Sequence, residues 1–191
     1  MKRIILITGG QRSGKSSYAE QLAMSLSDNP IYMATAHVWD EEFAERVRKH
    51  KNRRGPEWTN IEEEFYLSSH NVNGCVVLID CCTLWATNFF SKYRLKDGTE
   101  TIPDVNLVLE EMCKEFDKFT AQEATFIFVT NEIGLGGTSS NALQRCFTDL
   151  LGWFNQYIAS RANEVYFMVS GQPMVIKQSD SQNVRNNDTT H

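Results

Sequence analysis

The order of apolar and polar residues along the chain predicts alternating strands and helices. Short runs of consecutive apolar, often β-branched residues are typical of strands that are covered on both faces. These predicted strands span 3–8, 31–35, 75–80, 125–130 and 164–169. Apolar residues at helical spacing predict helices over 16–27, 40–53, 83–92, 105–119 and 141–161.

This alternation predicts an α/β fold with an open, doubly wound sheet of mostly parallel strands. Ligands of such a sheet bind at the carboxyl ends of the strands. Residues 174–177, after Gly171-Gln172-Pro173, are a candidate for an antiparallel edge strand. We expect residues 1–177 to form a single domain. Residues 178–191 contain one aliphatic side chain and are predicted to be a disordered tail.

Composition narrows the class of protein. Of the 191 residues, 41% are hydrophobic and 23% are charged, which is ordinary for a globular chain. The formal net charge of −5 argues against a general nucleic-acid binder, which needs a basic excess to neutralise phosphates. No run is long and apolar enough to span a bilayer, and Met1-Lys2-Arg3 leads directly into a strand rather than a signal-peptide core. We therefore expect a cytoplasmic protein without a membrane partner.

A phosphate-binding motif lies between the first predicted strand and the first predicted helix. The sequence there is Gly9-Gly10-Gln11-Arg12-Ser13-Gly14-Lys15-Ser16, which matches G-x-x-x-x-G-K-[ST] at every defined position. The glycines let backbone N–H groups and the helix N-terminus face phosphates. Lys15 would place a charge beside the β- and γ-phosphates, and Ser16 a hydroxyl on Mg²⁺. A chance match in a glycine-rich turn is the alternative, but the flanking strand and helix favour a P-loop.

A candidate metal carboxylate ends the predicted strand at 75–80. Asp80 follows the apolar run Val76-Val77-Leu78-Ile79, as the Walker B acid of a P-loop enzyme does. An aspartate at the end of a strand can also cap the following helix. We favour the metal role over the cap.

A second candidate site lies in a basic stretch. Residues 46–54 carry six of the 19 Lys and Arg residues of an otherwise acidic chain. One interpretation is a solvated helix face that is balanced by the acidic residues at 40–45. However, His50 follows Val47 by three residues and Phe43 by seven, which places it on their side of the helix. With an unperturbed pKa of about 6.5, a neutral imidazole is a competent nucleophile, although from the sequence alone a structural or capping histidine is more common.

An ordered series of short motifs runs along the whole chain. It comprises the P-loop, Tyr32-Met33-Ala34-Thr35, His50 with Arg53-Arg54, Trp58 through Glu62, Asp80-Cys81-Cys82-Thr83 with Asn88, Thr130-Asn131-Glu132-Ile133-Gly134, Asn155-Gln156 and Val169-Ser170-Gly171. In this series the chain resembles, from residue 4 to about 177, the bifunctional adenosylcobinamide kinase and adenosylcobinamide-phosphate guanylyltransferase family of cobalamin biosynthesis. A Walker motif by itself would fit many enzymes, whereas the ordered series fits this group.

The resemblance implies a RecA-like P-loop NTPase fold, which is a three-layer sandwich, and two activities. The first activity phosphorylates adenosylcobinamide with ATP or GTP. In the second, His50 attacks the α-phosphorus of GTP, releases pyrophosphate and passes GMP to adenosylcobinamide phosphate, giving adenosylcobinamide-GDP. The implied small-molecule partner is the corrinoid, and the implied assembly is a homo-oligomer, with a trimer favoured.

The resemblance also implies roles for individual residues. His50 and Lys15 are the implied catalytic residues, and Ser16 and Asp80 the implied ligands of Mg²⁺. The implied nucleotide-binding residues are Gly9, Gly10, Gln11, Arg12, Ser13, Gly14, Lys15, Ser16, Thr35, Arg53, Arg54, Glu62 and Asp80. Asn131 and Glu132 are candidates for orienting a substrate, and a capping or loop carboxylate is an equal alternative for Glu132.

Three positions depart from the family pattern. Pro56 comes one position late because Gly55 follows Arg54, and Asp80 stands where a glutamate also occurs. The loop Gly136-Gly137-Thr138-Ser139-Ser140 replaces a hydrophobic-proline turn, so its corrinoid-facing or interface role stays open.

Two other functions fit parts of the sequence. Another small P-loop kinase would keep residues 9–16 but would have no need of His50. A RecA-type non-catalytic, nucleotide-dependent module would act in assembly or bind DNA, and the acidic net charge disfavours DNA binding. A GTPase switch is disfavoured because the sequence holds no Asn-Lys-x-Asp motif.

Overall fold

The computed structural model describes residues 2–36, 41, 54–96 and 99–178. Apart from residue 41, the helix predicted over 40–53 lies outside the described residues, and so do His50 and Arg53. The predicted tail lies outside them as well, apart from residue 178.

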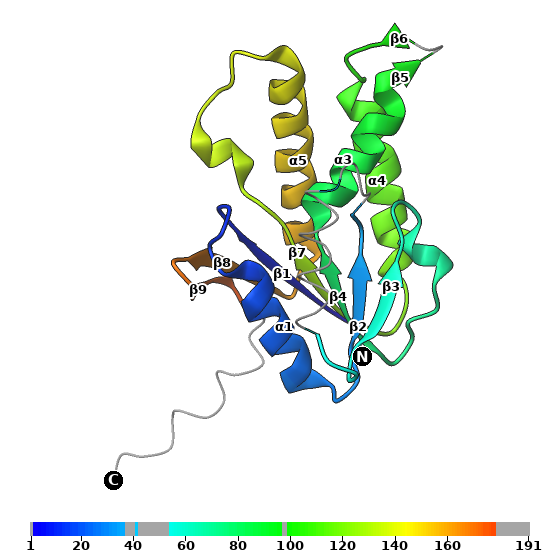
Figure 1. The fold of residues 1–191 in the computed structure, drawn as a ribbon, viewed down its shortest axis with the longest axis vertical. Coiled ribbons are helices and arrows are strands. Elements are labelled where there is room, and N and C mark those ends of the chain that lie inside the picture. The colour runs from blue at the N-terminus through cyan, green and yellow to red at the C-terminus, as the bar shows by residue number, and fades with distance from the viewer. Residues whose placement is uncertain (1, 37–40, 42–53, 97–98, 179–191) are drawn as a thin grey trace.

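A central sheet organises the described part of the chain (Figure 1). Its strands are β1 (Arg3–Gly9), β2 (Ile31–Ala34), β3 (Thr59–Glu62), β4 (Val76–Asp80), β7 (Thr125–Val129), β8 (Glu164–Val169) and β9 (Gln172–Lys177). They lie in the order β3-β2-β4-β7-β1-β8-β9, and every described pair is parallel except β8–β9. The predicted α/β fold with a mostly parallel sheet and an antiparallel edge strand is therefore confirmed.

Helices cover both faces of the sheet, which makes the three layers (Figure 1). α1 (Lys15–Leu26) covers one face, and α3 (Cys82–Arg94), α4 (Val105–Phe119) and α5 (Ala142–Arg161) cover the other. The shorter described elements are η1 (Leu67–Ser69), β5 (Leu95–Lys96), β6 (Thr99–Glu100) and η2 (Ile133–Gly136). Among the described residues, no helix has the length and apolar character that a membrane crossing needs.

The alternation of side chains along β1 divides the core into two. Ile4 and Leu6 belong to the core beneath α3, α4 and α5, whereas Ile5 and Ile7 belong to the core beneath α1. On the α1 side, Ala19 and Ala23 are fully buried one helical turn apart, and their small side chains let the helix lie close to the sheet. This close packing holds the N-terminus of α1 next to the end of β1.

One strand of the central sheet, β3, was not predicted from the sequence, and neither was the short antiparallel pair β5–β6. The residues of β3, Thr59–Glu62, include a single apolar side chain, and most of them are exposed. The strand forms because its backbone pairs with β2 and because Thr59 N donates to the carbonyl of Pro30 at 3.0 Å. Burial of apolar surface, on which sequence prediction of strands depends, contributes little to such an edge strand.

Candidate nucleotide-binding site

The P-loop, residues 9–16, joins the end of β1 to the start of α1 and requires glycine at two positions. Gly9 and Gly14 have φ angles of 149° and 96°. A Cβ atom at Gly9 would lie 2.6 Å from the carbonyl oxygen of Met168, and one at Gly14 would lie 3.0 Å from the Cα of Gly171. Gly171 N also donates to the carbonyl of Ser13 at 2.9 Å, so the turn between β8 and β9 supports the P-loop from outside.

Lys15 is the first residue of α1 and is buried, with 7% of its surface exposed. Its Nζ donates to the carbonyl of Gly10 at 2.5 Å and lies 3.4 Å from Ser13 Oγ. Burial lowers the pKa of the Lys15 ammonium, while Cys81 and Asp80 act to raise it. The side chain thus curls over its own loop, in the position from which a P-loop lysine meets phosphate oxygens.

A cavity of about 390 Å³ opens above the P-loop. Its lining residues are Arg12, Ser13, Gly14, Lys15, Ser16, Ser17, Asp80, Cys81, Val129 and Asn131. They come from the P-loop, from the first turn of α1 and from the carboxyl ends of β4 and β7, which are neighbouring strands of the sheet. The volume lies in the range of small-molecule sites, which begins at about 300 Å³.

Two of the oxygen donors on this cavity fit Mg²⁺. The hydroxyl of Ser16 and the carboxylate of Asp80 both line it, and Mg²⁺ in phosphate-transfer sites takes one or two protein oxygens besides phosphates and water. The alternative role for Asp80, a helix cap, does not match the structure: α3 begins at Cys82, so Cys81 holds the N-cap position. Burial raises the pKa of the Cys81 thiol to about 12, which keeps it neutral beside the carboxylate.

Asn131 and Glu132, although adjacent in the chain, line different cavities. Asn131 lines the cavity, and both its backbone N and its Nδ2 donate to Thr83 Oγ1, at 3.0 and 3.2 Å. Glu132 is not among the residues around this cavity. Its Oε1 accepts hydrogen bonds from Thr8 Oγ1 at 2.7 Å and from Asn155 Nδ2 at 3.2 Å, so it braces the end of β1 against α5.

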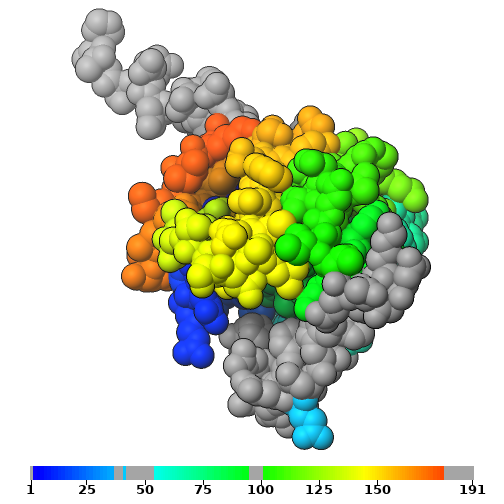
Figure 2. Space-filling view, turned by 90° about the horizontal axis from the view of Figure 1, so that it is seen from above, coloured from blue at the N-terminus to red at the C-terminus, as the bar shows by residue number. Residues whose placement is uncertain are grey.

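Glu132 instead lines a second cavity of about 430 Å³ on the α5 side of the sheet. Most of its lining is apolar and comes from β8, β9, η2 and α5, which lie next to one another in the view of Figure 2. Leu135 of η2 and Ile176 of β9 are 72% and 63% exposed at this cavity. The two cavities therefore differ in chemistry, one being built around the P-loop and the other around an apolar surface.

Thr35 and Glu62 lie on the other side of β4. Thr35, which follows β2, is fully buried, and its Oγ1 donates to the carbonyl of Cys81 at 2.8 Å. Asn88 of α3 donates through Nδ2 to the carbonyls of Thr35 and Glu64, at 2.7 and 2.9 Å. Glu62 is exposed at the end of the edge strand β3. The ends of β2 and β3 are thus tied to each other and to the segment that carries Asp80.

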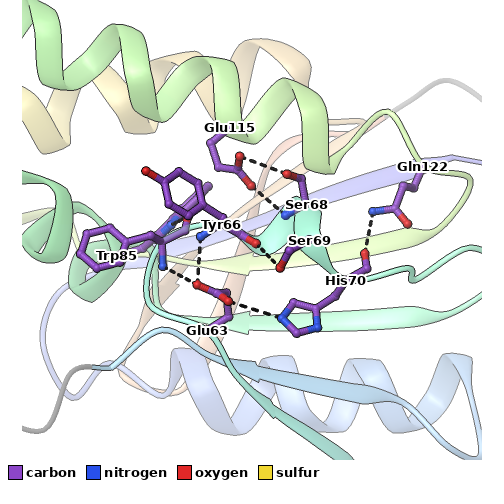
Figure 3. Close-up of polar contacts among 9 residues, drawn as sticks. Glu63, Tyr66, Ser68, Ser69, His70, Trp85, Glu115 and Gln122 are labelled. Atoms are coloured by element: carbon purple, nitrogen blue, oxygen red, sulfur yellow. Dashed lines mark hydrogen bonds and ion pairs between the residues drawn. The ribbon is translucent and has the colours of Figure 1, made fainter.

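The connection that follows Glu62 is held by polar contacts that the sequence did not reveal (Figure 3). Glu63 accepts hydrogen bonds from the backbone N of Phe65 and Tyr66 and lies 3.5 Å from His70 Nε2. Burial acts to raise the pKa of Glu63, but these hydrogen bonds outweigh it and lower the pKa. On α4, Glu115 accepts from Ser68 N at 2.7 Å and from its hydroxyl at 3.1 Å.

Arg54 is the one member of the proposed basic cluster, His50, Arg53 and Arg54, that lies within the described residues. Its guanidinium carbon lies 3.4 Å from the centre of the Tyr32 ring, and its Nε donates to Asn60 Oδ1 at 3.0 Å. The hydroxyl of Tyr32 donates to Asp80 Oδ2 at 3.0 Å. Tyr32 therefore contacts both Arg54 and Asp80, which lines the phosphate cavity.

Comparison with known proteins agrees with the geometry. A family model described as cobinamide kinase / cobinamide phosphate guanyltransferase matches residues 5–176. The chain belongs to this family. It is 37% identical over 176 residues to the bifunctional adenosylcobalamin biosynthesis protein CobP of Pseudomonas aeruginosa, covering 90% of this chain and 96% of CobP. It is 34% identical over 189 residues to CobU of Escherichia coli K12, covering 91% of this chain and 99% of CobU.

Membership makes the chain an enzyme of the bifunctional class that the family description names. A likeness among solved structures extends beyond the family and concerns the fold alone. A solved ATPase domain superimposes with a TM-score of 0.50 at 11% identity, covering 94% of this chain and 78% of that one. The P-loop NTPase fold that the family resemblance implied is thus confirmed.

Proposed function

We propose that this chain phosphorylates adenosylcobinamide with ATP or GTP, and then transfers GMP from GTP through a guanylylated His50 to adenosylcobinamide phosphate. The product is adenosylcobinamide-GDP. The observation that carries the proposal is the family match over residues 5–176, a range that contains both the P-loop and His50. The cavity above the P-loop supports it, because that cavity joins a buried lysine, a hydroxyl and a carboxylate at the carboxyl edge of the sheet.

In the kinase step, the P-loop backbone would bind the triphosphate and Lys15 would neutralise charge on the β- and γ-phosphates. Ser16 and Asp80 would hold Mg²⁺, which supplies charge neutralisation and alignment of the phosphates when it is bound. Asn131, which lines the cavity and is held by Thr83, would donate to a substrate oxygen. Glu132 would act indirectly, because its carboxylate is bonded to Thr8 next to the P-loop.

In the guanylyl step, a ring nitrogen of His50 attacks the α-phosphorus of GTP, and the bond to the β-phosphate oxygen breaks, releasing pyrophosphate. A phosphate oxygen of the acceptor then attacks the phosphoramidate, forms the new phosphoanhydride and frees the imidazole. An imidazole suits both displacements because it is a fair nucleophile and a fair leaving group. We assign Thr35, Arg53, Arg54 and Glu62 to nucleotide binding in this step.

We further propose that the protein is cytoplasmic and forms a homo-oligomer, a trimer by resemblance to the family. Exposed apolar side chains support self-association: Met174, Val175 and Ile176 of β9 are 53%, 56% and 63% exposed, and Ile176 lines a cavity together with the exposed Leu135 of η2. Light scattering of the purified protein would give the mass directly. A monomer at micromolar concentration would contradict the proposal.

Labelling with GTP tests the covalent step. The protein is incubated with GTP labelled at the α-phosphorus and with Mg²⁺, and the denatured chain is examined for label that acid releases and base does not. We expect label on the wild type and none on His50→Ala. The matched control is His70→Ala, because His70 pairs with Glu63 on the β3–β4 connection and should label like the wild type.

The outcomes of this experiment separate the proposed function from its main alternative. An unlabelled wild type that still phosphorylates cobinamide would be a P-loop kinase without guanylyl transfer. Equal labelling of His50→Ala and wild type would move the covalent intermediate to another residue. Either result overturns the proposed mechanism.

A further inference from the structure

Tyr32 connects two parts of the proposed site that belong to different segments of the chain. It lies on β2 in the core beneath α1 and is 5% exposed. Its hydroxyl donates to Asp80 Oδ2 at 3.0 Å, and Arg54 covers one face of its ring at 3.4 Å. Trp58 meets the same ring edge-on, with the ring centres 6.1 Å apart. The ring is thus held from two sides, and its hydroxyl points to the end of β4.

The direction of this hydrogen bond follows from the chemistry of its two groups. An ionised carboxylate can only accept hydrogen bonds, so the hydroxyl of Tyr32 is the donor across the 3.0 Å to Asp80 Oδ2. Asp80 Oδ2 is therefore occupied as an acceptor. Among the hydrogen bonds between described residues, none is made to Oδ1, and Asp80 lines the cavity above the P-loop.

We propose that Tyr32 is a positioning residue for Mg²⁺ binding: its hydroxyl fixes the orientation of the Asp80 carboxylate so that Oδ1 faces the cavity shared with Ser16 and Lys15. This proposal takes one part of the proposed function as its premise, namely that Asp80 is a ligand of Mg²⁺. A free carboxylate rotates about its last bond, whereas one with a bonded oxygen presents the other in a fixed direction. Loss of such outer contacts commonly weakens metal binding by about 10- to 100-fold.

Arg54 extends the same chain of contacts toward the basic stretch. A guanidinium over a tyrosine ring stabilises the pair, and Asn60 Oδ1 anchors the Nε of Arg54. The contacts run from Asn60 through Arg54 and Tyr32 to Asp80. They couple the position of β3 to the direction of a carboxylate two strands away.

The substitution Tyr32→Phe removes the hydroxyl and keeps the ring beneath Arg54. The readout is the binding of a fluorescent GTP analogue, titrated first with excess EDTA and then with increasing Mg²⁺. We expect the Mg²⁺ concentration for the half-maximal change to rise by about 10-fold. The affinity in EDTA should stay at the wild-type value, because the P-loop contacts with phosphate do not depend on Tyr32.

Tyr166→Phe is the matched control. The hydroxyl of Tyr166 donates to Glu164 Oε2 at 2.7 Å on β8, and neither residue lines the phosphate cavity. This variant loses a similar tyrosine–carboxylate hydrogen bond next to α1, and its Mg²⁺ dependence should match the wild type. Equal shifts in the two variants, or a loss of affinity in EDTA confined to Tyr32→Phe, would show a general structural effect and overturn the proposal.

Asp80→Asn, alone and combined with Tyr32→Phe, separates the positioning proposal from the metal assignment. If Tyr32 acts through Asp80, Tyr32→Phe should cause no further shift of the Mg²⁺ dependence in the Asp80→Asn background. A shift with Asp80→Asn but none with Tyr32→Phe alone refutes the positioning role and leaves Asp80 as a ligand. No shift with Asp80→Asn removes the metal assignment and the positioning role together. The GTP-labelling experiment on His50 is independent of all three results.

Discussion

Replacing Asn88 with leucine tests how the ends of β2 and β3 are held at the site. The amide is 3% exposed, and its Nδ2 donates to the carbonyls of Thr35 and Glu64 at 2.7 and 2.9 Å. Leucine has a similar shape but no donor, so both carbonyl oxygens lose the hydrogen bond from residue 88. Thr35 is fully buried, so losing the hydrogen bond to its carbonyl costs more than losing the one to Glu64.

The size of the effect follows from these two bonds. A buried polar group left without a partner costs about 1–3 kcal/mol, and the loss of a typical hydrogen bond costs about 0.5–1.5 kcal/mol. We therefore expect Asn88→Leu to lower the free energy of unfolding by about 3 kcal/mol. For a chain of this length, 1 kcal/mol shifts Tm by about 2–4 °C, so Tm should fall by about 6–12 °C.

Thermal unfolding followed by circular dichroism measures this shift. The control is Asn106→Leu, because Asn106 is exposed on α4 and its replacement should change stability by less than about 0.5 kcal/mol. If Asn88→Leu melts within about 2 °C of the wild type, the double hydrogen bond does not hold the strand ends together. An equal fall in the Asn106 control would attribute the loss to the added leucine rather than to the missing donor.

Two further predictions concern the P-loop and the β3–β4 connection. Gly9→Ala places a Cβ 2.6 Å from the carbonyl oxygen of Met168, so the loop must shift, and titration with a fluorescent GTP analogue should show at least about 10-fold weaker binding; wild-type affinity would contradict the loop geometry. The pKa of Glu63 is lowered in the folded protein, so its stabilisation is present above its ordinary pKa of 4.5 and is lost as the pH falls through the folded-state pKa. Urea unfolding should therefore find Glu63→Gln less stable than wild type by about 1 kcal/mol at pH 7, and this difference should shrink as the pH falls below 4.5. A difference that does not change with pH would rule out this linkage.

Much of the fold was readable because its physical causes are local. Each buried strand is a continuous apolar run, and each described long helix repeats apolar residues at helical spacing. The motif at residues 9–16 predicts the loop that joins β1 to α1. The strand β3 was missed because an edge strand of four residues with one apolar side chain is stabilised by backbone pairing with β2. Pairing between backbones does not depend on the pattern of apolar and polar side chains, so that pattern could not predict β3.

The sequence by itself determined the fold class, the P-loop and the place of Asp80 at the end of a parallel strand. Only the tertiary structure decided which neighbours share a cavity. Asn131 lines the cavity above the P-loop while Glu132, the next residue, bonds to Thr8 and lines the cavity on the α5 side of the sheet. Tyr32, 48 residues from Asp80 in the chain, lies within hydrogen-bonding distance of it. Such contacts depend on strand order and register, which arise when the separate runs pack together and which no local pattern of residues encodes.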